Sequence, residues 1–136
     1  MSQVNKQLTR RWFDEVWNKR NRAAIDELLD ADAIVHGLSG TVEPVRGREG
    51  FKQFHEAFLA AFPDIRVTPT HCFTEEDFAT VRFTFEATHS GPGFGEPTNR
   101  HIKCSGIAIV RWRDGKMIEG WNEFDRHGLM QQIAAR

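Results

Sequence analysis

Asp125, His89 and His36 are the residues whose types and positions best suit proton transfer. Asp125 ends the last strand-like segment, and a carboxylate held short of water can exchange protons with a carbon acid. His89 continues an apolar strand face, where a neutral imidazole can donate a hydrogen bond to a developing enolate. His36 ends an earlier short strand and is a second candidate donor. Asp125 is therefore a candidate general acid/base, and His89 and His36 are candidate assisting donors.

Each of these three residues also has a structural interpretation. Asp125 shortly precedes Leu129, so its carboxylate can cap a terminal helix. His89 and His36 each end a strand, where a loop carbonyl can satisfy the imidazole. Both interpretations remain open from the sequence. The chain contains no Tyr, so no phenol is available as a hydrogen-bond donor.

Asp114-Gly115 predicts a two-residue turn, which sets the pairing of the strands on either side. Trp112 then lies opposite Met117, and later pairs follow in step, with opposite residues sharing one sheet face. On this face Val110 lies opposite Glu119, and three small residues lie opposite large or acidic ones: Ala108 opposite Trp121, Gly106 opposite Glu123, and Cys104 opposite Asp125. The small residues leave room for a ligand. We predict that Trp121 and Glu119 lie in the cavity wall. The alternative for Glu119 is a structural ion pair with an arginine.

The opposite face of this hairpin is also partly apolar. It carries Ile107, Ile109, Ile118 and Phe124. Helices cover only one face of a sheet in a monomer, so a second apolar face indicates a partner. We predict a homodimer that packs through this outer face.

The elements that position these groups follow from the spacing of apolar residues. Helices are predicted over residues 4–17, in the segment that Asn21 caps, over 51–62 before Pro63, and over 129–135. Residues 37–50 predict a loop, and strands are predicted at 33–36, from 65, and over 78–89, 101–112 and 116–125. This order predicts an α+β fold, with N-terminal helices packed on a curved antiparallel sheet that encloses an apolar cavity. Phe54, Phe58, Phe83 and Phe85 are expected in the cavity wall.

Composition narrows the class of protein. A chain of 136 residues predicts one domain over residues 1–136, and a net charge of −1 argues against nucleic-acid or anionic-membrane partners. Cys72 and Cys104 form neither metal-ligand spacing nor a disulfide framework, and the N-terminus lacks an apolar signal core. We expect a cytoplasmic protein with a small hydrophobic ligand, no metal and no cofactor.

Several short motifs occur in an order typical of one family. They are Val45-Arg46-Gly47-Arg48-Glu49-Gly50-Phe51, Phe62-Pro63-Asp64-Ile65-Arg66-Val67, Thr88-His89-Ser90-Gly91, Ser105-Gly106-Ile107, Asp114 to Trp121, and Asp125 with Gly128 to Gln132. Over nearly its whole length the chain resembles the SnoaL-like polyketide cyclases, also called ester cyclases, of the nuclear-transport-factor-2-like superfamily. The resemblance implies a cone-shaped α+β barrel, a deep apolar cavity, a dimer and no cofactor.

The resemblance also implies a reaction. Characterised cyclases of this family close the last ring of an aromatic polyketide by intramolecular aldol reaction, with an acid/base aspartate that matches Asp125. We therefore expect a cyclase or related isomerase acting on a hydrophobic carbonyl compound. The alternatives are a hydratase or epoxide hydrolase, and a module of the same fold that binds a small molecule without turnover.

Overall fold

A computed structural model describes residues 2–38 and 43–134 of the chain. The helices are α1 (Ser2–Arg11), η1 (Trp12–Asn18), α2 (Arg22–Leu28), α3 (Gly47–Ala61) and α4 (Arg126–Ala134). The strands are β1 (Leu29–His36), β2 (Val45–Arg46), β3 (Arg66–Glu75), β4 (Phe78–Thr88), β5 (His101–Arg113) and β6 (Lys116–Phe124).

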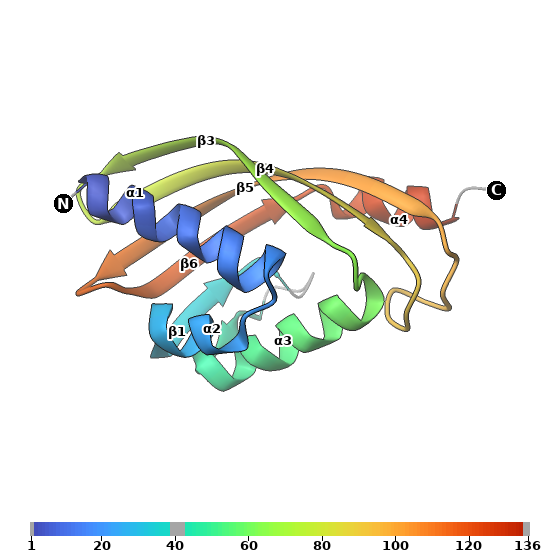
Figure 1. Cartoon of the computed structure of the whole chain (residues 1–136), viewed down its shortest axis with the longest axis horizontal. Coiled ribbons are helices and arrows are strands. Elements are labelled where there is room, and N and C mark those ends of the chain that lie inside the picture. The colour runs from blue at the N-terminus through green and yellow to red at the C-terminus, as the bar shows by residue number, and fades with distance from the viewer. Residues whose placement is uncertain (1, 39–42, 135–136) are drawn as a thin grey trace.

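One curved sheet carries the fold. Its six strands run in the order β2-β1-β6-β5-β4-β3. The first three helical segments and α3 lie on one side of the sheet, and α4 lies near the end where β6 finishes (Figure 1). The predicted α+β class and the helices on a curved sheet are confirmed. The sheet is mixed, because β1 pairs in parallel with β6 whereas the other pairs are antiparallel.

The helix boundaries follow local chemistry. The Asn21 side chain accepts a hydrogen bond from the Ala23 amide at 3.1 Å, so it caps α2 as predicted. Pro63 follows the end of α3, also as predicted. Two boundaries were wrong: α3 already begins at Gly47, inside the predicted loop, and α4 begins at Arg126. Residues 39–42 of that predicted loop lie outside the described residues.

The second half of the long N-terminal helix is π-helical. In η1 the Lys19 amide donates to the Asp14 carbonyl at 2.8 Å, a bond that spans five residues. The wider turn buries adjacent pairs of side chains on one side: Trp12 and Phe13, then Val16 and Trp17. These four side chains form the face of η1 that packs into the interior.

Strand β4 follows the predicted alternation. Val81, Phe83 and Phe85 are buried, whereas the intervening Arg82 and Glu86 are exposed. On the neighbouring β5, Gly106 and Ala108 face the same interior. The alternation fixes which residues can reach a cavity between the sheet and the helices.

The predicted register of the last hairpin is wrong beyond the turn. Trp112 lies opposite Met117 as predicted, but Arg111 lies opposite Glu119, so Ile118 is the extra residue of a β-bulge. A one-residue shift moves every later side chain of β6 to the other face. The interior therefore receives Gly120, Asn122 and Phe124, and the outer face receives Glu119, Trp121 and Glu123.

Candidate functional site

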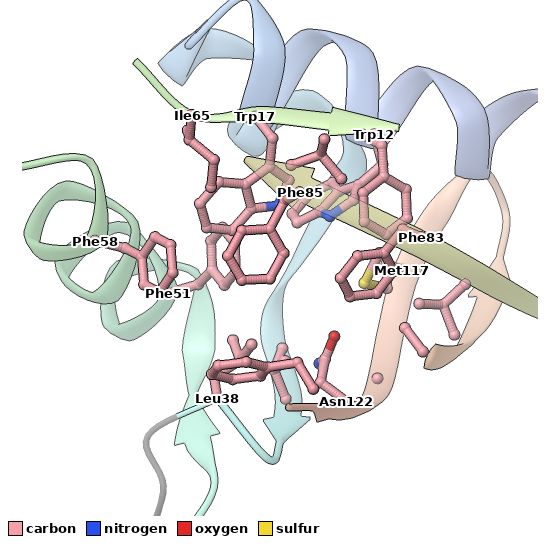
Figure 2. A pocket seen from close by; sticks show the side chains of 17 residues that line it. Trp12, Trp17, Leu38, Phe51, Phe58, Ile65, Phe83, Phe85, Met117 and Asn122 are labelled. Atoms are coloured by element: carbon pink, nitrogen blue, oxygen red, sulfur yellow. The ribbon is translucent and has the colours of Figure 1, made fainter. Parts of the chain in front are cut away.

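An apolar cavity lies between the sheet and the helices, as Figure 2 shows. Its volume is about 70 Å³. We call it the inner chamber. Its walls come from η1, β1, α3 and strands β3 to β6, and its lining residues are Trp12, Phe13, Trp17, Val35, Leu38, Phe51, Phe58, Ile65, Val67, Phe83, Phe85, Ala108, Val110, Met117, Gly120, Asn122 and Phe124. Within this described lining no side chain is charged.

Three polar groups interrupt the apolar wall. The Asn122 side chain donates through Nδ2 to the His36 carbonyl at 3.2 Å, which leaves Oδ1 as an acceptor on the cavity side (Figure 2). The indole rings of Trp12 and Trp17 point into the same space (Figure 2), and no hydrogen bond within the described chain uses their N–H groups. The chamber therefore offers two donors and one acceptor to a ligand that is otherwise apolar.

A second, wider space adjoins the first. It is an open groove at the surface rather than an enclosed cavity; we call it the outer chamber, and its volume is about 500 Å³. Its lining residues are Leu38, Phe54, Ala57, Phe58, Gly93, Phe94, Gly95, Arg126 and Met130. Leu38 and Phe58 line both chambers, so these two side chains separate the inner space from the outer one.

The four predicted phenylalanines all reach this region, although in different places. Phe83 and Phe85 line the inner chamber, and Phe58 lines both chambers. Phe54 lines only the outer chamber and is partly buried. Their rings form a continuous aromatic contact, with Phe58 lying 5.6 Å from Phe54 and 6.2 Å from Phe85 between ring centroids.

Asp125 does not line the cavity, so its predicted position on the cavity face is wrong. It is exposed, and its Oδ1 accepts a hydrogen bond from the Gly128 amide at 2.9 Å. Its carbonyl accepts from the Leu129 amide at 3.0 Å, which is the first bond of α4. The carboxylate is thus the N-cap of α4, the structural alternative that the sequence also allowed.

His89 is fully buried but faces a loop. Its Nε2 donates to the Gly93 carbonyl at 2.6 Å, and its Nδ1 lies 3.0 Å from Thr98 Oγ1. Both ring nitrogens are engaged, so neither is free to donate to a ligand. The imidazole holds the 89–100 loop in place, and that loop carries Phe94 to the outer chamber.

His36, Glu119 and Trp121 lie together on the outer face of the sheet. His36 Nε2 lies 2.8 Å from Glu119 Oε2, and its ring stacks on Trp121 at 5.6 Å between centroids. The predicted placement of Trp121 and Glu119 in the cavity wall is therefore wrong, because the bulge at Ile118 turns both outward. Only the backbone carbonyl of His36 is linked to the cavity, through Asn122.

Three other buried titratable groups, His55, Cys72 and Cys104, lie outside the chambers, and burial raises the pKa of the Cys72 thiol. Burial lowers the pKa of His55, whose Nε2 donates to the Val16 carbonyl at 2.8 Å. Burial, with the negative charge of Asp125, raises the pKa of the Cys104 thiol to about 11. A neutral imidazole and a neutral thiol are packing groups in these positions. Across residues 2–38 and 43–134, no cluster of three or more His, Cys, Asp or Glu side chains is arranged to hold a metal ion.

A family model for SnoaL-like polyketide cyclases matches residues 7–133. The chain belongs to this family. A protein from Jannaschia sp. CCS1 assigned to the SnoaL-like polyketide cyclases has a TM-score of 0.90 at 22% identity, covering 99% of this chain and 94% of that one. IdmH of Streptomyces antibioticus, assigned as a polyketide cyclase, has a TM-score of 0.84 at 24% identity, covering 96% and 99%. TsrD of Streptomyces laurentii has a TM-score of 0.85 at 25% identity, covering 100% and 98%. No curated protein matches this sequence.

In this SnoaL-like domain, reasoning from sequence missed four polar groups of the site: the Asn122 amide, the indoles of Trp12 and Trp17, and the Arg126 guanidinium. For Asn122 a signal existed. The signal was present in the composition of β6, where Glu119 and Glu123 alternate with Gly120 and Asn122. A cavity lined by aromatic rings cannot hold two unpaired carboxylates, so Gly120 and Asn122 had to face inward.

Within the described residues, no helix is both long and apolar enough to span a membrane.

Proposed function

We propose that this SnoaL-like domain binds a small, ring-containing hydrophobic carbonyl compound in the inner and outer chambers. The observation that carries the proposal is the inner lining, which is apolar apart from Asn122 and the indole N–H groups of Trp12 and Trp17. Sites for small organic ligands combine apolar walls with a few placed polar groups in this way. The indole N–H groups suit a carbonyl oxygen, and Asn122 Oδ1 suits a hydroxyl.

Binding is tested with a neutral fluorescent probe, N-phenyl-1-naphthylamine, whose emission rises in apolar surroundings. We expect saturable binding by the wild type and weaker binding by Ala108→Leu, which fills the inner chamber. Ile107→Leu is the matched control, since Ile107 is the adjacent β5 residue and points to the outer face. Equal affinity in all three proteins would place the probe outside the cavity.

The second candidate is cyclisation by intramolecular aldol reaction, with Asp125 as general acid/base; membership of the family favours it. Such a reaction needs a base near the acidic carbon, and a cavity that desolvates the base and aligns the two carbons. Asp125 directly follows Phe124, which lines the inner chamber, but its carboxylate caps α4. Release of that cap would therefore have to accompany the reaction.

A turnover assay on a panel of aromatic poly-carbonyl compounds separates the two candidates. If Asp125 is the base, Asp125→Asn retains the helix cap and loses turnover. If the domain only binds, wild type and Asp125→Asn bind the same compounds equally and neither converts them. A converting wild type with an equally active Asp125→Asn variant would remove Asp125 from the mechanism.

We also propose that two copies associate through the outer face of the sheet. Ile107 and Ile109 are 49% and 40% exposed there. Phe124, predicted in this interface, instead lines the inner chamber. We expect a dimer at micromolar concentration by light scattering, and a monomer for Ile109→Glu; Val4→Glu, on the exposed side of α1, is the control. A monomeric wild type would contradict the proposal.

The buried free thiols of Cys72 and Cys104 suit a reducing compartment such as the cytoplasm.

A further inference from the structure

Arg126 is the only charged side chain in the described lining of the outer chamber. Its guanidinium carbon lies 4.9 Å from the centre of the Phe94 ring, which is a cation–π contact. The remaining lining residues are apolar or glycine, and none of the ion pairs between described residues involves Arg126. A positive charge is therefore held against an aromatic wall with no carboxylate beside it in the chamber.

The position of Arg126 in its helix does not explain this arrangement. Arg126 is the first residue of α4, where the helix dipole places partial positive charge and a basic side chain is unfavourable. Asp125 offsets that cost at the cap, since its carboxylate already accepts from the Gly128 amide. Arg126 thus contributes little to the helix, and its side chain is held instead by Phe94 over the chamber.

The sizes of the two chambers determine where a ligand must lie. The inner chamber, at about 70 Å³, is smaller than the cavity of on the order of 150 Å³ that holds one benzene ring in a protein core. Even a single ring therefore cannot lie wholly inside the inner chamber, and a ring-containing compound must extend past Leu38 and Phe58 into the outer chamber. The part of the ligand that remains outside then lies against Phe94 and within reach of Arg126.

We propose that the ligand is an amphipathic organic anion: an apolar ring system bearing a carboxylate or similar anionic group, whose charge pairs with Arg126. This inference rests on the proposed binding function and specifies its ligand class. One edge of the ring system enters the inner chamber past Leu38 and Phe58, and the anionic end stays in the outer chamber. A guanidinium favours such groups because its N–H donors match two anionic oxygens at once.

The test uses two probes that share one ring system and differ in charge. N-phenyl-1-naphthylamine is neutral, and 8-anilinonaphthalene-1-sulfonate carries one sulfonate on the same framework. Both are titrated by fluorescence against wild type, Arg126→Gln and Arg126→Lys at low and high salt. Arg113→Gln is the matched control, because Arg113 is an exposed arginine at the far end of β5 and lines neither chamber.

We expect Arg126→Gln to weaken the sulfonate probe by about tenfold, the size of one lost charged hydrogen bond. The neutral probe should bind the variant within twofold of wild type, which also shows that the variant is folded. Arg126→Lys should fall between the two, and Arg113→Gln should match wild type. Salt should weaken the sulfonate probe in wild type and much less in Arg126→Gln.

Three results overturn the inference. Equal losses for both probes, or no loss for either, would remove Arg126 from charge recognition while leaving the cavity as a binding site. Failure of both probes to bind wild type would instead overturn the binding function, and the inference with it.

Discussion

Two glycines that face the interior from neighbouring strands should respond in opposite ways to one added methyl group. Gly120 lines the inner chamber, and a Cβ built there meets Met117 Sδ and Val110 Cγ1 at 3.7 Å, which is ordinary contact. A Cβ on Gly106 would lie 2.8 Å from Phe83 Cζ and 2.9 Å from the Glu123 carbonyl oxygen. The first methyl enters free space and the second enters occupied space.

The magnitudes follow from these contacts. Gly120→Ala buries one methyl, worth about 0.8 kcal/mol, and restricts the unfolded backbone by about 0.4–1 kcal/mol, so we expect stabilisation of about 1–2 kcal/mol. Gly106→Ala has the same backbone gain, but the overpacking costs about 1–3 kcal/mol, because the carbonyl of Glu123 cannot rotate away as the Phe83 ring can. The two variants should differ by at least about 1 kcal/mol.

Urea unfolding measured by circular dichroism gives both free energies, and titration with N-phenyl-1-naphthylamine gives the effect on the cavity. Gly120→Ala should raise the urea midpoint and weaken the probe by about fivefold, since the methyl displaces about 1 kcal/mol of ligand contact. Gly106→Ala should lower the midpoint. If Gly120→Ala destabilised the fold as much as Gly106→Ala, the space beside Gly120 would not be empty and the inner chamber would not exist as described.

Three further predictions test individual contacts. Burial lowers the pKa of His55 below its ordinary 6.5, so in mildly acidic solution the unfolded chain binds a proton that the folded chain does not. The free energy of unfolding should therefore fall as the pH drops below about 6.5, by up to about 1.4 kcal/mol per pH unit. Thermal unfolding of His55→Gln should lack this pH dependence, and an unchanged dependence would exclude His55 as its source. Asp125→Ala should lose about 1 kcal/mol of stability, while Asp125→Asn should keep most of it; equal losses in chemical denaturation would argue against the cap. Thr9→Val removes the hydroxyl that accepts a hydrogen bond from the buried Trp112 Nε1 at 2.9 Å, so it should lower the free energy of unfolding by about 1–3 kcal/mol. Thr9→Ser keeps the hydroxyl and should lower it by almost nothing. A Thr9→Val variant as stable as wild type would show that water replaces the hydroxyl.

The helices and most strands could be predicted because their signals are local. The alternation from residue 78 to 89 and the cap at Asn21 depend on residues next to one another, and both are confirmed. The parallel pairing of β1 with β6 could not be predicted in this way, since it joins segments some eighty residues apart. The π-helical turn at Trp12–Asn18 also has no signal in the helical spacing that predicted the element.

The candidate site was predicted less well because its residues depend on register and on loop contacts. The aromatic wall from α3 and β4 follows from periodicity, and Phe58, Phe83 and Phe85 line the inner chamber. His89 was assigned to the correct buried face, but its partners come from the 89–100 loop, whose path the sequence does not fix. An imidazole on an apolar face can donate a hydrogen bond to a ligand only where no protein carbonyl already accepts that bond.

The bulge at Ile118 decides which chemistry the cavity can perform, and burial energies explain why the bulge forms. A regular hairpin would turn Glu119 and Glu123 into a space walled by aromatic rings, where each unpaired carboxylate costs several kcal/mol. The bulge leaves one residue out of the ladder, at a far smaller cost, and turns both acids outward, where His36 pairs with Glu119. The interior gains the neutral amide of Asn122 in their place. Such a cavity suits the binding and orienting of a polar group of a ligand better than the holding of a base. Any proton acceptor would have to come from a residue at the edge of the cavity.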